Sequence, residues 1–181
     1  FLSEEDHAYA MEKIMQRVAD AMVAEGTPFT GVLYGGLMKT PNGIKVIEFN
    51  ARFGDPETEV VLPRLKSDAI DVFMAVASNE QPVAEWSEGA TLGIVLASKG
   101  YPGDYTKGHV IRGVERVESK VYHMGTAMKD GELVTNGGRV MFVVAEAPTL
   151  REAQQKAMED VERIECDNLF HRNDIGAKAF R

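Results

Sequence analysis

The stretch Val46-Ile47-Glu48-Phe49-Asn50-Ala51-Arg52-Phe53-Gly54-Asp55-Pro56-Glu57-Thr58-Glu59 carries most of what this chain reveals about its fold and chemistry. Residues two apart on a β-strand face the same way, about 6.6 Å from each other, so Glu48 and Asn50 project together. Ile47 and Phe49 then face the opposite side. A carboxylate beside an amide oxygen suits Mg²⁺, which takes the rest of its shell from nucleotide phosphates and water. The same two residues fit a solvated strand end equally well.

The residues after this strand concentrate charge around a bend. Arg52 supplies a rigid guanidinium fork suited to a carboxylate or a phosphate. The sequence Gly54-Asp55-Pro56 favours a tight turn immediately beyond it. In a purely structural alternative, Arg52 pairs with Asp55 or Glu57 to fix the loop.

Outward from this stretch, the first part of the chain alternates helices and strands. Residues 29–38 and 44–50 predict two antiparallel strands around a turn at Pro41-Asn42-Gly43. Residues 3–25 predict an amphipathic helix that Ser3 caps with Asp6 three positions on. A shorter helix is expected to begin near Ser67.

The pattern changes after Pro82, where a polar segment at 81–90 predicts a linker. Four short strands are expected beyond it, at 92–97, 109–114, 121–124 and 139–145, followed by a helix that Thr149 and Glu152 open as a capping box. The sequence therefore predicts an α+β protein with one domain over 1–80 and a smaller, strand-rich domain over 91–181.

Composition excludes several classes of function. The 181 residues are 44% hydrophobic with a formal net charge of −8, which argues against a nucleic-acid-coating surface. The apolar runs fall far short of the roughly 20 residues that a membrane span needs. The single cysteine, Cys166, excludes an internal disulfide and a multi-cysteine metal site, and indicates a cytoplasmic setting.

A second group of candidate residues lies at Asn136-Gly137-Gly138-Arg139. A glycine pair can direct backbone N–H groups at an anion, and an arginine can close on it. An ordinary hairpin turn between 133–134 and 140–141 explains the same residues, and from the residues alone we favour the turn.

The run from Glu48 to Glu59 resembles the signature of the phosphoribosylamine-glycine ligases, in which Arg-Phe-Gly-Asp-Pro-Glu follows the Glu-x-Asn metal strand of the ATP-grasp fold. The resemblance spans nearly the whole chain, through residues 35–38, 100–105, 123–126, 135–140 and 172–176. It implies the C-terminal part of an ATP-grasp domain over 1–80 and the C-terminal domain of the ligase over 91–181.

This resemblance implies a reaction of purine biosynthesis. ATP phosphorylates glycine, and the amine of 5-phosphoribosylamine attacks the acyl phosphate to give glycinamide ribonucleotide, ADP and phosphate. Glu48 and Asn50 are then the ligands of Mg²⁺ or Mn²⁺. Arg52 and Asp55, with Gly54 and Pro56, are expected at the glycine and acyl-phosphate site, whereas the phosphoribosylamine pocket is expected near Asn136, Gly137, Gly138 and Arg139.

The chain also departs from the family pattern. The N-terminal domain and the earlier ATP-grasp segments are not visible, and residues 30–38 contain no Asp or Glu to act as an additional metal ligand. We therefore expect these residues alone to lack ligase activity. Two alternatives remain: another ATP-grasp carboxylate-amine ligase, which has no reason to carry the run from Arg52 to Glu57, and a non-catalytic module, which a test of Mg²⁺ and nucleotide binding would distinguish.

Overall fold

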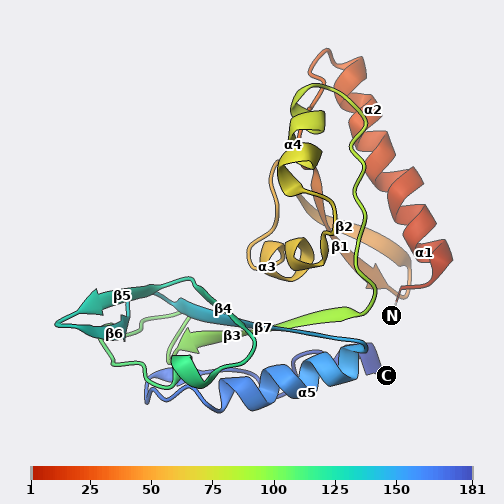
Figure 1. Ribbon diagram of the computed structural model, residues 1–181. Coiled ribbons are helices and arrows are strands. Elements are labelled where there is room, and N and C mark those ends of the chain that lie inside the picture. Colours follow the sequence, from red (N-terminus) through yellow and green to blue (C-terminus); the bar gives the residue numbers. More distant parts are fainter. Residues whose placement is uncertain (1, 181) are drawn as a thin grey trace. The chain divides into compact units, whose positions relative to one another are not determined.

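The computed structural model describes residues 2–180, which form two compact units (Figure 1). The first unit comprises residues up to 58 together with 65–86. The second comprises residues 59–64 together with 87 onward. Helices and antiparallel strands are largely segregated along the chain, which confirms the α+β class predicted from the sequence.

A long helix opens the first unit, as predicted. It runs as α1 (Glu4–Tyr9), a π-helical segment η1 (Ala10–Met15) and α2 (Gln16–Ala24). Ser3 accepts a hydrogen bond from the Asp6 backbone amide, and the Asp6 side chain accepts one from the Ser3 amide. This capping box satisfies two of the amide groups that a helix start leaves without partners.

A β-hairpin follows, made of β1 (Tyr34–Thr40) and β2 (Gly43–Asn50). Its two-residue turn confirms the predicted reversal, and Gly43 takes the positive φ of 86° that favours glycine. Residues 29–33 were expected in the first strand but lie outside it, because β2 ends at Asn50, opposite Tyr34, and offers them no partner.

Three short helical elements follow the hairpin along the chain. They are α3 (Thr58–Val61), the 3-10 turn η2 (Leu62–Arg64) and α4 (Ala69–Ala77). Asp68 caps α4 by accepting hydrogen bonds from the amides of Ile70 and Asp71. The predicted helix near Ser67 is therefore present.

The second unit is built on a four-stranded antiparallel sheet in the order β4-β7-β3-β8. These strands are β3 (Ala90–Ser98), β4 (Lys120–His123), β7 (Arg139–Ala147) and β8 (Leu169–Phe170). A separate ribbon pairs β5 (Thr126–Lys129) with β6 (Glu132–Thr135), and two 3-10 turns, η3 (Val114–Arg116) and η4 (Ala177–Phe180), complete the unit.

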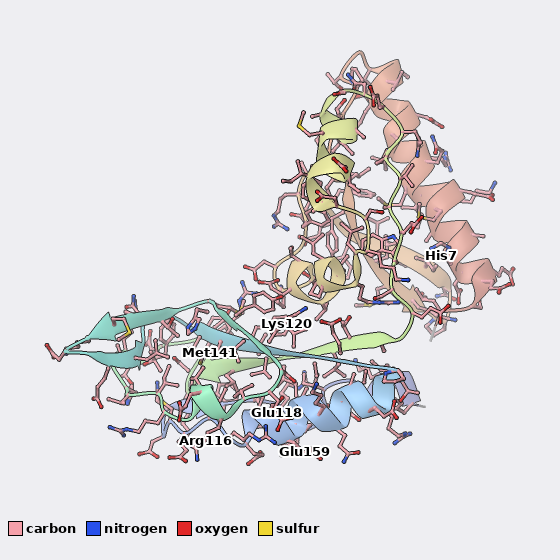
Figure 2. The ribbon with its side chains drawn as sticks, in the orientation of Figure 1. His7, Arg116, Glu118, Lys120, Met141 and Glu159 are labelled. Atoms are coloured by element: carbon pink, nitrogen blue, oxygen red, sulfur yellow. The ribbon has the colours of Figure 1, made fainter. Side chains whose placement is uncertain are left out.

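Helix α5 (Leu150–Val161) lies along this sheet against β3 and β7 (Figure 1). The predicted capping box of Thr149 and Glu152 opens it. Ala153 and Ala157 on its buried face let the helix approach the strands closely. Met141, labelled in Figure 2, is 0% exposed and belongs to the apolar cluster to which both α5 and the sheet contribute.

The two units differ sharply in how much apolar surface they bury. Within residues 2–180, the buried hydrophobic side chains of the first unit are only Ala10 and Ile44, whereas the second unit contains a contiguous cluster of eleven buried apolar residues. The first unit leaves large apolar side chains in solvent, including Ile47 at 62% and Ile70 at 71% exposure. Its amphipathic elements therefore lack a covering layer within the described chain.

One predicted strand is wrong. Residues 109–114 make only isolated bridges, from Val110 to Val134 and from Arg112 to Glu165. Gly108 and Gly113 flank the segment with φ of 85° and 81°, which breaks the extended backbone at both ends. No helix within the described chain has the length and apolar character of a membrane span.

Candidate active site

The end of the β1–β2 hairpin gathers polar groups on one face. Tyr34 lies directly opposite Asn50, and Gly36 lies opposite Glu48. Side chains of directly opposed residues in an antiparallel pair project to the same face. The amide Nδ2 of Asn50 donates a hydrogen bond to Glu48 Oε1 at 3.0 Å. The structure therefore places Glu48 and Asn50 side by side, as the strand period predicts.

Gly36 lets the Glu48 side chain lie close against β1. A Cβ atom at this position would lie 3.1 Å from Glu48 Cγ, which is tighter than about nine in ten real Cβ contacts. Of the facing pair Gly36 and Glu48, only Glu48 therefore contributes a side chain to this face.

A cavity of about 300 Å³ opens at this end of the hairpin. It collects five of the residues predicted for the glycine and metal sites, Glu48, Asn50, Arg52, Gly54 and Asp55. Pro56 is not among its lining residues. Tyr34 and Glu57 also line it, and sequence reasoning did not select them as site residues.

The guanidinium group of Arg52 is not used to fix the loop through Glu57. Its Nη1 donates to the carbonyl oxygen of Phe53 at 2.9 Å, and Arg52 is exposed. Among residues 2–180, Arg52 and Glu57 form no ion pair within 4 Å. The remaining donors of Arg52 can therefore face the cavity, which suits an anionic ligand.

A tight turn holds Glu57 against Gly54. The Thr58 amide and hydroxyl both donate to the Gly54 carbonyl oxygen, at 3.0 and 2.5 Å, and this starts α3. A Cβ atom on the buried Gly54 would overlap the Glu57 carboxylate. Glycine is therefore required at this position if Glu57 is to keep its place.

The Tyr34 phenol interacts with the Glu57 carboxylate, and both residues line this cavity. Burial raises the pKa of the Tyr34 phenol, and the charge and hydrogen bond of the Glu57 carboxylate raise it further. Tyr34 therefore remains a protonated donor at neutral pH. No local signal in the sequence selects it, because its place beside Asn50 depends on the register of the hairpin.

The lining residues fit a divalent cation that brings ligands of its own. Glu48, Asp55 and Glu57 supply three carboxylates against the one guanidinium of Arg52, a formal balance of −2. Within residues 2–180, no group of three or more His, Cys, Asp or Glu side chains is placed to hold a metal ion. The pair Glu48 and Asn50 thus suits Mg²⁺ that takes its other ligands from phosphates and water, rather than a cage built only from protein.

The second group of predicted residues, Asn136 to Arg139, belongs to the other unit and is not a hairpin turn. The strand before it, β6, pairs with β5, whereas the strand after it, β7, pairs with β3 and β4. The alternative favoured from the residues alone is therefore wrong, because the flanking strands are not partners. Asn136 to Gly138 form a connection between two sheets.

This connection is held from several sides. Ser98 donates from its hydroxyl to the Gly137 carbonyl and from its amide to the Gly138 carbonyl, both at 2.8 Å. The ring of Tyr101 fills the space that a Gly138 side chain would occupy. Because both carbonyls point at Ser98, the following N–H groups of Gly138 and Arg139 point the opposite way across their trans peptide planes.

Comparison with known proteins places both units in one family. Residues 1–58 match the model of the phosphoribosylglycinamide synthetase ATP-grasp (A) domain, and residues 91–178 match that of the phosphoribosylglycinamide synthetase C domain. A phosphoribosylamine–glycine ligase of Halalkalibacterium halodurans is 54% identical over 94% of this chain and 40% of its own length. One of Vibrio parahaemolyticus is 45% identical over 98% of this chain and 43% of its own.

Solved structures agree with this grouping. The phosphoribosylamine–glycine ligase of Thermotoga maritima superposes with a TM-score of 0.85 at 32% identity, covering 97% of this chain and 44% of that one. The biotin carboxylase domain of the Hydrogenobacter thermophilus 2-oxoglutarate carboxylase shares the fold alone, with a TM-score of 0.59 at 15% identity over 94% of this chain and 38% of that one. The chain spans about 40% of the length of the curated relatives it matches. It belongs to the phosphoribosylglycinamide synthetase family, of which it carries sequence matching the ATP-grasp domain and the C domain.

Proposed function

We propose that this chain forms part of an ATP-dependent phosphoribosylamine–glycine ligase, in which it supplies the metal-binding end of the active site. The observation that supports this most directly is the cavity at the end of the β1–β2 hairpin. It gathers Glu48, Asn50, Arg52, Gly54 and Asp55, all from the stretch that resembles the family signature. The proposed reaction joins glycine to 5-phosphoribosylamine at the expense of ATP.

Glu48 and Asn50 are the proposed ligands of Mg²⁺ or Mn²⁺. When bound, the metal neutralises charge on the phosphates and on the transferred group. The strand β2 fixes the two side chains on one face, and the Asn50 Nδ2 group donates a hydrogen bond to Glu48 Oε1, which leaves Asn50 Oδ1 available as an acceptor. Positioning of this kind supports transfer of phosphate from ATP to the glycine carboxylate.

Arg52 and Asp55 are the proposed catalytic residues at the glycine end of the cavity. The Arg52 guanidinium balances negative charge on the glycine carboxylate and then on the acyl phosphate. Gly54, Asp55 and Pro56 shape the turn beside it. The phosphoribosylamine nitrogen then attacks the acyl carbon, and phosphate leaves as the amide bond forms.

Asn136, Gly137, Gly138 and Arg139 are the proposed contacts of 5-phosphoribosylamine. The N–H groups of Gly138 and Arg139, directed away from Ser98, are suited to an anion such as the substrate phosphate. We further propose that residues 1–80 are the C-terminal portion of the ATP-grasp domain, 81–90 a linker and 91–181 the C domain, and that the enzyme works in the cytoplasm.

The isolated chain is proposed to be inactive. Its relatives are more than twice as long, and the first unit leaves Ile47 and Ile70 exposed where a packing layer is expected. Both substrates would then be incompletely positioned. A coupled assay that detected glycine-dependent ADP release from the purified chain would contradict this.

The full-length enzyme tests the metal assignment. Glu48→Ala and Asn50→Ala should each lower Mg²⁺-dependent turnover by more than about 100-fold, since even residues that only orient metal ligands contribute 10- to 100-fold. Glu12→Ala, which changes a carboxylate exposed on η1, is the matched control and should leave turnover unchanged. Circular dichroism establishes that each variant is folded. Full activity in both cavity variants would show that the strand end is structural.

A further inference from the structure

Glu57 is a carboxylate of the cavity to which the proposed reaction assigns no task. It is half-buried, and its partner within residues 2–180 is the Tyr34 hydroxyl. It forms no ion pair with Arg52, although both line the same 300 Å³ cavity. A half-buried carboxylate with one neutral donor retains unused acceptor capacity, because an ionised carboxylate has about four lone-pair sites.

The surrounding residues keep this carboxylate in place. Tyr34 lies opposite Asn50 in the hairpin, and its phenol interacts with the Glu57 carboxylate. Gly54 leaves room for the Glu57 carboxylate, and a side chain at position 54 would occupy that room. The interaction with Tyr34 and the space left by Gly54 therefore both act on the position of the Glu57 carboxylate.

A free amino acid carries a carboxylate and an ammonium group, so a site that selects it needs one fixed cation and one fixed anion. The cavity provides the cation in Arg52 and a spare anion in Glu57. Building on the proposed function, we propose that Glu57, held by Tyr34, binds the α-ammonium group of the glycine substrate while Arg52 faces its carboxylate. Glu57 thereby distinguishes an amino acid from a simple carboxylic acid of the same size.

The alternative task for Glu57, direct metal binding, is less well supported. Glu48 and Asn50 are already paired on β2. In the described part of the chain, Glu48, Asp55 and Glu57 are not grouped as three ligands of one metal ion. An ammonium ion needs no such convergence, because one or two charge-assisted hydrogen bonds suffice.

Steady-state kinetics of the full-length enzyme with Glu57→Gln test this proposal. The KM for glycine should rise by about 10- to 150-fold, which corresponds to the loss of a hydrogen bond between charged groups. The KM for MgATP should stay within about twofold. Acetate, which lacks the ammonium group, should compete with glycine more effectively by a similar factor. Glu12→Gln, an exposed carboxylate outside the cavity, is the matched control.

Tyr34→Phe provides a second variant if Glu57→Gln fails to fold. It removes only the hydroxyl that positions Glu57, so the KM for glycine should rise by about 2- to 10-fold with an unchanged melting temperature and unchanged MgADP binding. An unchanged KM for glycine in both variants would overturn the proposal, as would a selective rise in the KM for MgATP. Absence of glycine-dependent ADP formation in the wild-type enzyme would instead refute the proposed function itself.

Discussion

Replacement of Asp160 is the sharpest test of the energetics of the second unit. This carboxylate lies in the last turn of α5, and its residue is 1% exposed. It accepts hydrogen bonds from the backbone amides of Glu118 at 3.1 Å and Ser119 at 2.9 Å, and pairs with Arg163 Nη1 at 2.8 Å. Figure 2 labels Glu118 close to this helix. Asp160 therefore ties the segment before β4 to α5.

Asp160→Ala should lower the free energy of unfolding of the second unit by about 3–5 kcal/mol. The substitution leaves two part-buried amides without acceptors, at about 1–3 kcal/mol each, and removes the least exposed partner of the Arg163 guanidinium. Asp160→Asn keeps the size but loses the charge, so a smaller loss of about 1.5–3 kcal/mol is expected.

Urea unfolding followed by circular dichroism measures both losses, with a decrease in midpoint of at least about 1 M for Asp160→Ala. Trp86, the only tryptophan in the sequence, lies in the first unit. The urea transition followed by its fluorescence should therefore differ little between Asp160→Ala and wild type, and it serves as an internal control. Hydrogen exchange of the β7 amides should accelerate in parallel. A loss below about 1 kcal/mol for Asp160→Ala would refute the assignment of Asp160 as a buried, fully used acceptor.

The same contacts set the sign of a pH effect. Burial disfavours the charge on Asp160, but hydrogen bonds from Ser119 and Glu118 and the charge of Arg163 outweigh it and hold the pKa below the ordinary 3.8. The unfolded chain therefore binds a proton at a higher pH than the folded one. The stabilisation is complete above pH 3.8 and is lost as pH falls through the folded pKa, so the difference between wild type and Asp160→Asn should shrink below pH 3.8.

Three further substitutions have defined outcomes. Gly54→Ala should displace the Glu57 carboxylate and raise the KM for glycine in the full-length enzyme by about 10-fold or more. The melting temperature should change by no more than about 2 °C, because the two atoms that the new Cβ would overlap most, Glu57 Oε2 and Cδ, lie at the end of a flexible side chain. Ser98→Ala should lower the free energy of unfolding, measured in urea, by about 1–3 kcal/mol, because Ser98 is 0% exposed and its hydroxyl donates to the Gly137 carbonyl. An equal loss in Ser98→Thr, which keeps a hydroxyl, would contradict the hydrogen bond as the cause. Gly93→Ala should lower the free energy of unfolding by about 1–3 kcal/mol, because the new Cβ would overlap the ring of Phe142, which is only 3% exposed. A thermal midpoint equal to that of the wild type would disprove this overlap.

Local sequence signals predicted the elements that local chemistry determines. The Ser3–Asp6 and Thr149–Glu152 capping boxes open the helices where the sequence indicated, since each depends on residues three apart. The hairpin turn before Gly43 is equally local. The adjacency of Glu48 and Asn50 follows from the two-residue period of a strand, and the structure reproduces it.

Features that depend on distant pairing were beyond the same signals. Whether Asn136-Gly137 forms a hairpin depends on which strands pair, and β6 pairs with β5 rather than with β7. Asp160 reads as a solvated helix residue until the amides of Glu118 and Ser119, more than 40 positions earlier, are placed against it. Tyr34 enters the candidate site only through its register with Asn50 and its contact with Glu57.

The first unit shows why an amphipathic pattern identifies an apolar face without identifying what covers it. The apolar residues on one side of α4 and the alternating apolar residues of β2 both predict burial. Ile70 on α4 and Ile47 on β2 are nevertheless exposed within residues 2–180. Exposing an apolar side chain instead of burying it forgoes about 1.5–3 kcal/mol for each residue. The second unit buries its stripes within its own helix and sheet, so we expect it to carry most of the stability of this chain. The candidate site thus lies on the unit with the least core of its own, where a further layer of protein would both stabilise the hairpin and close the cavity around its ligands.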